Sequence, residues 1–299
     1  MANDLVIVVT GSNRGVGKGI VQLLAKQRLD RPLAIYATSR SGAVSNIEAS
    51  SPNLVRYGKL DITDQSSIQT FLQSVFKEHS AIDVLINNAA VANDHRETPE
   101  YAAETVRNNW GGTKNMCEAF LAGSIMSRKP WSRIVNVTSG MNQLSKYGPE
   151  LQEKFRAVKS VPDIDALAAS YIEIVKRGPE AQEQAGWGSG ARSYKVSKAL
   201  IMAMTILLAK QNPEIMINNA CPGWTDTVMG KQGNDALQPP KTPEEGARVP
   251  VRLAIGDLES SGDEDGGLGK ESERVSGMFF ENDNIMAKGW GKSKLWVET

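Results

Sequence analysis

Cysteine and histidine are scarce in this chain of 299 residues, which has two of each. Cys117 and Cys221 lie far apart in the sequence and form no paired-cysteine or cysteine–histidine motif. We therefore expect neither a structural zinc site nor a disulfide framework, and we predict no metal. Two buried, reduced thiols are the expected state, and they fit a reducing compartment.

The chain also lacks a net charge and a long apolar run. Its 34 basic residues balance 34 acidic ones, so it has no basic excess of the kind that marks nucleic-acid or membrane-surface binders. No run approaches the ~18 apolar residues that a membrane span needs. The apolar run at 5–9 is too short for a secretion signal and follows no basic segment. We expect a cytoplasmic protein with no nucleic-acid and no membrane partner.

Short apolar runs alternate with longer segments of helical periodicity along the chain. Alternation of this kind predicts parallel strands joined by right-handed helical crossovers. The predicted fold is therefore α/β, a Rossmann-type doubly wound parallel sheet of about seven strands with helices on both faces. The expected strands are 5–9, 33–38, 54–60, 82–86, 132–137, 215–220 and 275–280, and a long helix is expected at 98–123.

Two segments interrupt this alternation. Residues 141–190 have helical segments but no strand pattern, so we predict a helical insertion before Tyr194. Residues 257–274 are rich in glycine, serine and acidic residues and are expected to form a mobile surface loop. Because expected strands lie on either side of both segments, residues 1–299 are predicted to form a single dinucleotide-binding and catalytic domain.

A glycine-rich turn separates the first expected strand from the first helix. Its glycines allow the backbone to come close to a pyrophosphate, and the helix that follows offers free N–H groups and the positive end of its dipole. A tight turn without function is the alternative, but the position between strand and helix favours the dinucleotide site. The expected cofactor residues here are Gly11, Asn13, Arg14, Gly15, Val16 and Gly17.

The end of the second expected strand indicates which dinucleotide binds. NAD enzymes place an acidic residue there to bind the ribose 2′-hydroxyl, whereas this strand ends at Arg40 with no acid. Arg40, with Arg14, is suited to pair with a 2′-phosphate, so we predict NADPH/NADP+ as the cofactor; two solvated surface arginines are the alternative. Asp61, next to Ile62, is expected at the adenine, and Asn88 at the cofactor crevice.

A tyrosine and a lysine four residues apart form the candidate catalytic pair. Tyr194 and Lys198 fall on one face of an expected helix. A free tyrosine has a pKa near 10, and a cation beside it stabilises the phenolate, so Tyr194 is suited to protonate a carbonyl oxygen that receives hydride. Ser139 ends the fifth strand, where it can orient that oxygen or serve as a turn residue. Asn109, near two glycines, has a low helix propensity for a position inside an expected helix. Such a residue can indicate a functional site or simply an exposed position.

These motifs occur along the chain in the order that is typical of the short-chain dehydrogenase/reductase family. The resemblance to that family covers essentially the whole chain. The resemblance implies that Tyr194 is the acid, that Lys198 binds the nicotinamide ribose and tunes Tyr194, and that Ser139 orients the carbonyl. It also implies that Asn109 holds a water in a proton relay to Lys198. The further residues that it implies at the cofactor are Asn88, Val137, Pro222, Gly223, Thr225 and Thr227.

The chain bears a closer resemblance to the monomeric carbonyl reductases of that family. This similarity is carried by the spacing of 55 positions from Ser139 to Tyr194, the segment 109–113, the Cys-Pro-Gly-Trp at 221–224 and the ending at 277–290. It implies a monomer, because the insertion packs where other members dimerise, and it places Met141 and Trp224 at the substrate. Ala90 departs from the family, which usually has glycine there.

The expected function is NADPH-dependent reduction of the carbonyl group of a small aldehyde, ketone or quinone, with Tyr194 as proton donor. A dehydrogenase that runs the same chemistry in reverse is an alternative enzyme. An NADP(H)-sensing regulatory protein without turnover, or a scaffold protein, are alternatives of other classes, because a fold alone does not fix a function. The complete set of serine, tyrosine, lysine and asparagine favours the enzyme.

Overall fold

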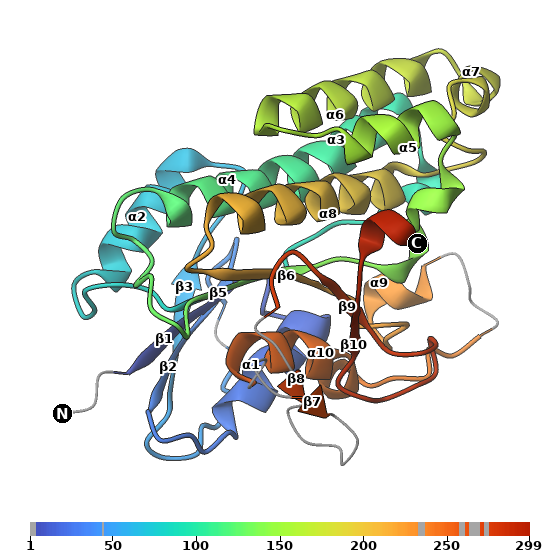
Figure 1. The fold of residues 1–299 in the computed structure, drawn as a ribbon. Coiled ribbons are helices and arrows are strands. Elements are labelled where there is room, and N and C mark those ends of the chain that lie inside the picture. Colours follow the sequence, from blue (N-terminus) through green and yellow to red (C-terminus); the bar gives the residue numbers. More distant parts are fainter. Residues whose placement is uncertain (1–3, 44, 233–236, 257–260, 263–269, 272–274) are drawn as a thin grey trace.

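An eight-stranded sheet forms the centre of the protein in the computed structural model, which describes residues 4–43, 45–232, 237–256, 261–262, 270–271 and 275–299 (Figure 1). The α/β fold predicted from the sequence is confirmed. The strands of this sheet are β1 (Leu5–Val9), β2 (Leu33–Ser39), β3 (Leu54–Lys59), β4 (Val84–Asn87), β5 (Arg133–Val137), β6 (Met216–Ala220), β9 (Phe279–Glu281) and β10 (Lys292–Lys294).

The strand order places a binding crevice at the middle of the sheet. The order is β10-β9-β6-β5-β4-β1-β2-β3, and neighbours are parallel except for the pair β9–β10. The chain runs outward from β1 to β3 on one side and from β4 to β9 on the other. Crossover helices therefore cover opposite faces, and a crevice opens at the carboxyl ends of β1 and β4.

All seven expected strands are present, and the eighth was missed. The segment Lys292–Lys294 pairs antiparallel with β9 at the edge of the sheet, and its two lysines give no apolar signal. Charged residues are common on edge strands because they discourage pairing with other chains. Within the expected acidic loop, Ser261–Gly262 (β7) and Lys270–Glu271 (β8) form a small antiparallel pair; the rest of that prediction lies outside the described residues.

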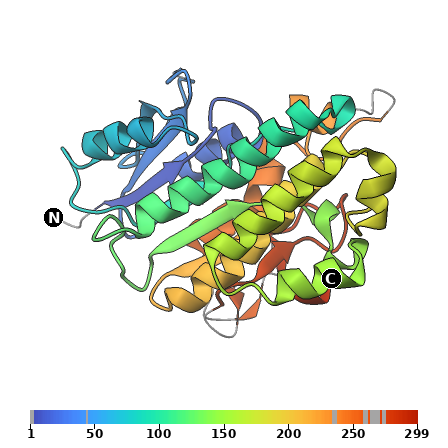
Figure 2. The same cartoon turned by 90° about the horizontal axis from the view of Figure 1, so that it is seen from above.

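Helices cover both faces of the sheet (Figures 1 and 2). Each face has its own apolar core, one centred on α8 and one on α1 and α10. α1 and α10 pack closely because Gly19 has no side chain: a Cβ there would overlap the carbonyl of Pro243. One layer contains α2 (Gln65–Val75), α3 (Pro99–Val106), α4 (Gly112–Leu121) and α8 (Ser193–Gln211), and the other α1 (Gly15–Ala25) and α10 (Pro243–Ile255).

The long helix expected at 98–123 is interrupted by a π-helical turn. Residues Arg107–Gly111 form this turn between α3 and α4, with Asn109 at its centre. π-Turns occur mostly as single bulges inside α-helices and frequently at functional sites. The low helix propensity of Asn109 beside two glycines is the sequence signal for this break.

The insertion before α8 is helical, as predicted, and packs on α8 and α3. Its elements are η3 (Gly140–Asn142), η4 (Leu144–Lys146), α5 (Pro149–Arg156), α6 (Val161–Lys176) and α7 (Pro179–Gln184). Tyr147, Phe155 and Trp187 form an aromatic cluster with Trp296, which lies in the C-terminal η5 (Trp296–Glu298). Trp296 also donates a hydrogen bond to the carbonyl of Asn142 (2.9 Å), which fixes the segment just after Ser139.

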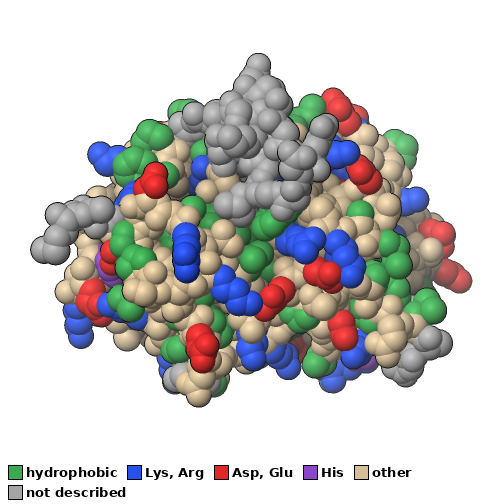
Figure 3. Space-filling model, turned by 90° about the horizontal axis from the view of Figure 1, so that it is seen from below, with side chains coloured by type: hydrophobic (Ala, Val, Ile, Leu, Met, Phe, Trp, Pro, Cys, Tyr) green, Lys and Arg blue, Asp and Glu red, His purple; other side chains and the backbone are tan. Residues whose placement is uncertain are grey.

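Positive and negative side chains are interspersed on the face shown in Figure 3. The ion pairs of the protein include Lys26–Glu244 and Lys288–Glu245. Both cysteines are buried free thiols, as expected. Among the described residues, no helix is long and apolar enough to cross a membrane, and no cluster of histidine, cysteine and acidic side chains has the arrangement of a metal site.

Candidate active site

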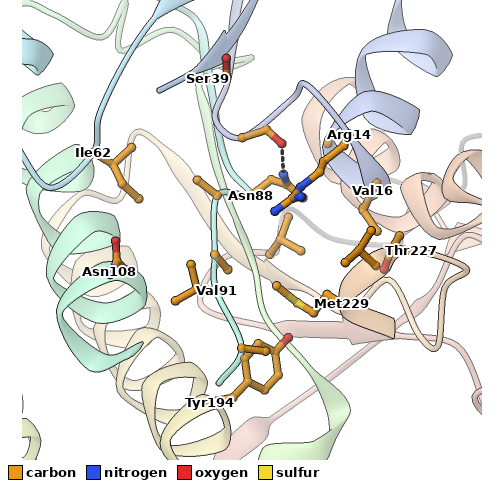
Figure 4. Close-up of a pocket in the computed structure, with 18 of the residues that line it drawn as sticks. Arg14, Val16, Ser39, Ile62, Asn88, Val91, Asn108, Tyr194, Thr227 and Met229 are labelled. Atoms are coloured by element: carbon orange, nitrogen blue, oxygen red, sulfur yellow. Dashed lines mark hydrogen bonds between the residues drawn. The ribbon is translucent and has the colours of Figure 1, made fainter. Parts of the chain in front are cut away.

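A cavity of about 480 Å³ lies at the carboxyl ends of β1, β2 and β4, where the strand order reverses. It extends from Ser39, at the end of β2, to Tyr194, in the first turn of α8 (Figure 4). Arg14 and Val16 line one side, and Ile62 and Asn108 line the opposite side. The glycine-rich turn, where the sequence predicts a dinucleotide site, lines this cavity.

The glycine-rich turn can adopt its shape only without side chains. Gly11 and Gly15 have φ of 64° and 55°, in the left-handed region. A Cβ on Gly17 would overlap the Gly11 carbonyl and the side-chain amide of Asn88. That amide donates hydrogen bonds to the carbonyls of Thr10 (3.0 Å) and Gly11 (3.1 Å), so the end of β4 holds the turn in place (Figure 4).

The cavity is basic where β2 ends. Arg14 and Arg40 both line it, beside Ser39. Asp61 lines the same end: burial raises its pKa, but hydrogen bonds from Thr63 and the nearby charge of Arg40 outweigh burial and lower it. Arg14 is also the N-cap residue of α1 and provides no side-chain cap, so the first N–H groups of that helix lack a side-chain acceptor from this residue. Two guanidinium groups and a helix N-terminus fit a dinucleotide that carries an additional phosphate.

A second cavity, of about 780 Å³, adjoins the first. Tyr194 lines both, so it lies where they meet. Ser139, Met141 and Trp224 line the second cavity, together with Cys221. The Trp224 indole donates to the carbonyl of Gly230 (2.7 Å), so its ring is tied to α9 (Val228–Lys231).

The candidate catalytic pair lies on one face of α8, as predicted. The Lys198 amine lies 5.6 Å from the centroid of the Tyr194 ring and donates to the Val137 carbonyl (2.8 Å). Burial lowers the pKa of Lys198 to about 8. Burial raises the pKa of Tyr194, nearby Cys221 and Asp94 raise it further, and the side chain of Ser139 lowers it. Tyr194 therefore holds its proton in this environment, as a proton donor must.

Asn109 is fully buried and lines neither cavity. Its amide nitrogen donates to the Val91 carbonyl (2.9 Å) and the Ser197 hydroxyl (3.0 Å), and its oxygen accepts from the Val91 N–H (2.8 Å). The π-turn thus positions a side chain that joins the segment after β4 to α8. Both of its N–H donors are engaged by the protein itself.

Buried asparagines connect the strands beneath the site. Asn87, Asn136 and Asn219 occupy matching positions on β4, β5 and β6. Asn87 donates to Asn136 (2.9 Å), which donates to the Thr205 hydroxyl on α8 (2.8 Å), and that hydroxyl lies 2.9 Å from the Asn219 oxygen. Asn87 is therefore a structural residue inside the sheet, and only Asn88 reaches the cavity.

The structure divides the sequence-predicted residues between the two cavities. Gly223 and Thr225, expected at the cofactor, line the second cavity and not the first, and Asn109 lines neither. Ala90, the departure from the family pattern, lines the first cavity. The predicted residues in the first cavity are Gly11, Asn13, Arg14, Gly15, Val16, Gly17, Arg40, Asp61, Ile62, Asn88, Val137, Tyr194, Lys198, Pro222 and Thr227.

Two lining segments were missed from the sequence. Residues 91–96 follow β4 and line the first cavity, the second or both, and residues 281–285 follow β9 and line the second. Ligands bind at the carboxyl ends of parallel strands, so their positions after two expected strands were the available signal. Lys241, which is buried and lines the second cavity, offered no such signal.

Comparisons with known proteins agree with this geometry. Residues 5–149 match the family model of the short chain dehydrogenases. The chain is 34% identical to carbonyl reductase (NADPH) 1 of Sus scrofa, over 99% of both chains. The structure of salutaridine reductase from Papaver somniferum is similar, with a TM-score of 0.74 and 25% identity over 93% of this chain and 99% of that one.

An NADPH-bound carbonyl reductase from chicken fatty liver has the same fold. Its TM-score is 0.61, with 23% identity over 95% of this chain and 99% of that one. The near-complete coverage by the Sus scrofa relative confirms the resemblance predicted from the motifs. The chain therefore belongs to the short-chain dehydrogenase family, in its carbonyl reductase branch.

Proposed function

We propose that this protein uses NADPH to reduce the carbonyl group of a small aldehyde, ketone or quinone, with Tyr194 as the proton donor. The position of Tyr194 at the junction of the two cavities carries this proposal. The first cavity has the shape and charge for the dinucleotide, and the second has room for a substrate. The curated relative from Sus scrofa is named as an NADPH carbonyl reductase, which supports the same assignment.

The side chains around Tyr194 have complementary roles in this proposal. Bound NADPH supplies the hydride. Tyr194 gives its proton to the oxygen of the reduced carbonyl, and the Ser139 hydroxyl, on the same cavity wall, orients that oxygen. Lys198 is largely protonated at neutral pH with its pKa of about 8, so its charge stabilises the phenolate that the transfer leaves behind.

The adenosine end of the first cavity supports a preference for NADPH over NADH. Arg14 and Arg40 lie where the second strand ends, and no acidic residue takes the place of Arg40. Guanidinium groups bind a phosphate through charge-assisted hydrogen bonds, whereas an acid at this point would repel it. Asn88 and the glycine-rich turn would hold the pyrophosphate beside the N-terminus of α1.

We further propose a single catalytic domain that acts as a cytoplasmic monomer. The helical insertion supports the monomer, because α6 packs against α8 and α3 of the same chain. Met141 and Trp224 would form the walls of the substrate site.

Loss of NADPH absorbance in the presence of aldehydes, ketones and quinones tests the proposed function. Wild type should oxidise NADPH with at least some of these carbonyls, and Tyr194→Phe should lower kcat by a factor of about 10² to 10⁴ while NADPH still binds. Tyr101→Phe is a matched control, because Arg96 lies over its ring and that contact survives the change. Binding of NADPH without turnover of any carbonyl would instead support the sensor hypothesis.

A further inference from the structure

The first turn of α8 is capped by two carboxylates from a distant segment. The N-cap residue of α8, Arg192, provides no side-chain cap. Instead, Glu97 accepts hydrogen bonds from the N–H groups of Arg192 (3.0 Å) and Ser193 (2.8 Å). Asp94 accepts from the N–H of Tyr194 itself (2.9 Å) and from the Ser193 hydroxyl (3.0 Å). Three backbone donors at the start of α8 are thus satisfied by side chains about 100 residues away in sequence.

These two carboxylates belong to the segment that separates the two cavities. Residues 91–97 follow β4 and include η1 (Asp94–Arg96). Residues 91–93 and Arg96 line the first cavity, whereas Asp94 and His95 line the second. One end of the segment is fixed by Asn109, which pairs with both backbone groups of Val91. The other end is fixed by the start of α8, so the segment connects the π-turn to Tyr194.

We propose that Asp94 and Glu97 are positioning residues of the reaction, which fix Tyr194 at the junction of the two cavities and favour its protonated form. This inference rests on the proposed role of Tyr194 as proton donor. Neither residue takes part in the bond changes, and both act through α8. The hydroxyl of Tyr171, on α6, lies 3.4 Å from Glu97, so the insertion supports the same contact.

The charge of this cap opposes that of the helix it closes. The N-terminus of a helix carries a partial positive charge that stabilises a nearby anion, here a Tyr194 phenolate. Asp94 and Glu97 place two negative charges at that terminus, which favours the neutral hydroxyl. Lys198 on α8, Cys221 after β6 and Ser139 after β5 also face Tyr194, and His95, Lys241 and Glu281 line the same cavity.

Besides burial and Cys221, the cap therefore contributes to the pH dependence of both reaction directions. Asp94 is one of the groups that raise the pKa of Tyr194. Reduction needs the protonated tyrosine and declines as pH rises through this pKa, whereas oxidation needs the phenolate and increases there. If the carboxylate is neutralised, the pKa falls, and both transitions move to lower pH.

Asp94→Asn and Asp94→Ala separate the charge of the cap from its geometry. Asparagine is a good N-cap residue and retains an acceptor, so Asp94→Asn should keep kcat near wild type at neutral pH but shift both transitions down by about one pH unit. Asp94→Ala should show the same shift and also lower kcat about tenfold, with little change in the KM for NADPH. The tyrosinate absorbance of each variant, minus that of its Tyr194→Phe counterpart, reports the pKa of Tyr194 without turnover.

Asp64→Ala is the matched control, because the Asp64 carboxylate also caps a helix N-terminus, that of α2, and lines neither cavity. Its carboxylate accepts from the Ser66 N–H at 2.9 Å. The control should lower Tm and leave kcat and the Tyr194 titration unchanged. Glu97→Gln should shift the titration in the same direction as Asp94→Asn and by less, since Glu97 does not contact Tyr194 directly.

Two outcomes separate this inference from the proposed function. If Tyr194→Phe abolishes turnover but both Asp94 variants keep the wild-type titration and kcat, the positioning role is wrong and the proposed function stands. If Tyr194→Phe retains full turnover, the proposed function itself is wrong. If Asp64→Ala and Asp94→Ala lower kcat equally, the cap at α8 contributes only to stability and the inference is wrong.

Discussion

The two cavities differ in how the chain builds them. At the end that we propose for the adenosine and pyrophosphate, the first cavity is lined by short segments that follow strands β1, β2, β3 and β4, including Gly11, Gly15 and Gly17 of the glycine-rich turn. The second combines residues of α1 and α8 with segments that follow β4, β5, β6 and β9. Its walls are side chains such as Met141, Trp224 and Ile285. The dinucleotide side is thus encoded locally, and the substrate side only by the complete fold.

This difference fits the ligand that we propose for each cavity. A pyrophosphate is recognised by N–H groups and a helix terminus, which a fixed turn provides and few sequences can replace. A carbonyl substrate is recognised by the shape of its walls, and many side chains can provide a shape. Tyr194 lies where the two cavities meet, on the helix that both share, and Lys198 lines the first cavity one turn further along that helix.

Lys198→Met should have the largest effect on activity, because Lys198 lies beside Tyr194 at the junction of the two cavities. The variant removes the cation beside Tyr194 and the hydrogen bond to the Val137 carbonyl. We expect kcat to fall by a factor of about 10² to 10⁴, as for other losses of acid–base machinery. Lys195→Met, a lysine on the same turn of α8 that lies outside both cavity linings, is the control and should retain most activity.

Lys198 also makes stability depend on pH in a defined direction. Burial lowers its pKa from 10.5 to about 8, so between these values the unfolded chain binds a proton that the folded chain does not. The free energy of unfolding of wild type, relative to Lys198→Met, should therefore rise by about 3 kcal/mol from pH 8 to pH 10.5. Urea unfolding of both proteins at these two pH values measures it. A constant difference would contradict burial as the cause.

Arg40→Asp should have the next largest effect, confined to the dinucleotide side. The change removes a cation from the end of β2 and adds the acid that NAD enzymes have there. Charge-assisted hydrogen bonds are worth about 1.5–3 kcal/mol, so the ratio of kcat/KM for NADPH to that for NADH should fall about tenfold to a hundredfold. Arg28→Asp, at an exposed position away from the cavity, should leave the ratio unchanged. If Arg40→Asp fails to raise relative NADH use, the cofactor assignment is wrong.

The difference between features encoded locally and features formed by distant segments explains what the sequence could predict. The glycine-rich turn, the Tyr194–Lys198 spacing and all seven parallel strands are local patterns, and the structure contains each of them. Asn109 stood out through its poor helix propensity, and the structure places it in a π-turn. Its partners, Val91 and Ser197, could not be predicted because three segments meet there only in the fold.

The features that the sequence did not predict have no local sequence pattern. Strand β10 has no apolar pattern, since it lies at the edge of the sheet and its residues are exposed or only partly buried. The carboxylates of Asp94 and Glu97 look like surface charges in the sequence. Only their position opposite α8 makes them caps, because a helix that lacks its own N-cap gives no indication of where its partner lies.

Met141→Ala should have the smallest effect and sharpens the comparison from the substrate side. Its side chain is 60% exposed on the wall of the second cavity, so the change should alter the free energy of unfolding by no more than about 0.5 kcal/mol. Losing this apolar surface should raise KM for an apolar carbonyl about threefold to tenfold, while kcat and the KM for NADPH stay near wild type. Leu54→Ala, at a 50% exposed position on β3, should change none of these constants. If KM is unchanged for large and small carbonyls, Met141 is not part of the substrate wall. That result would leave the assignment of the dinucleotide side unaffected.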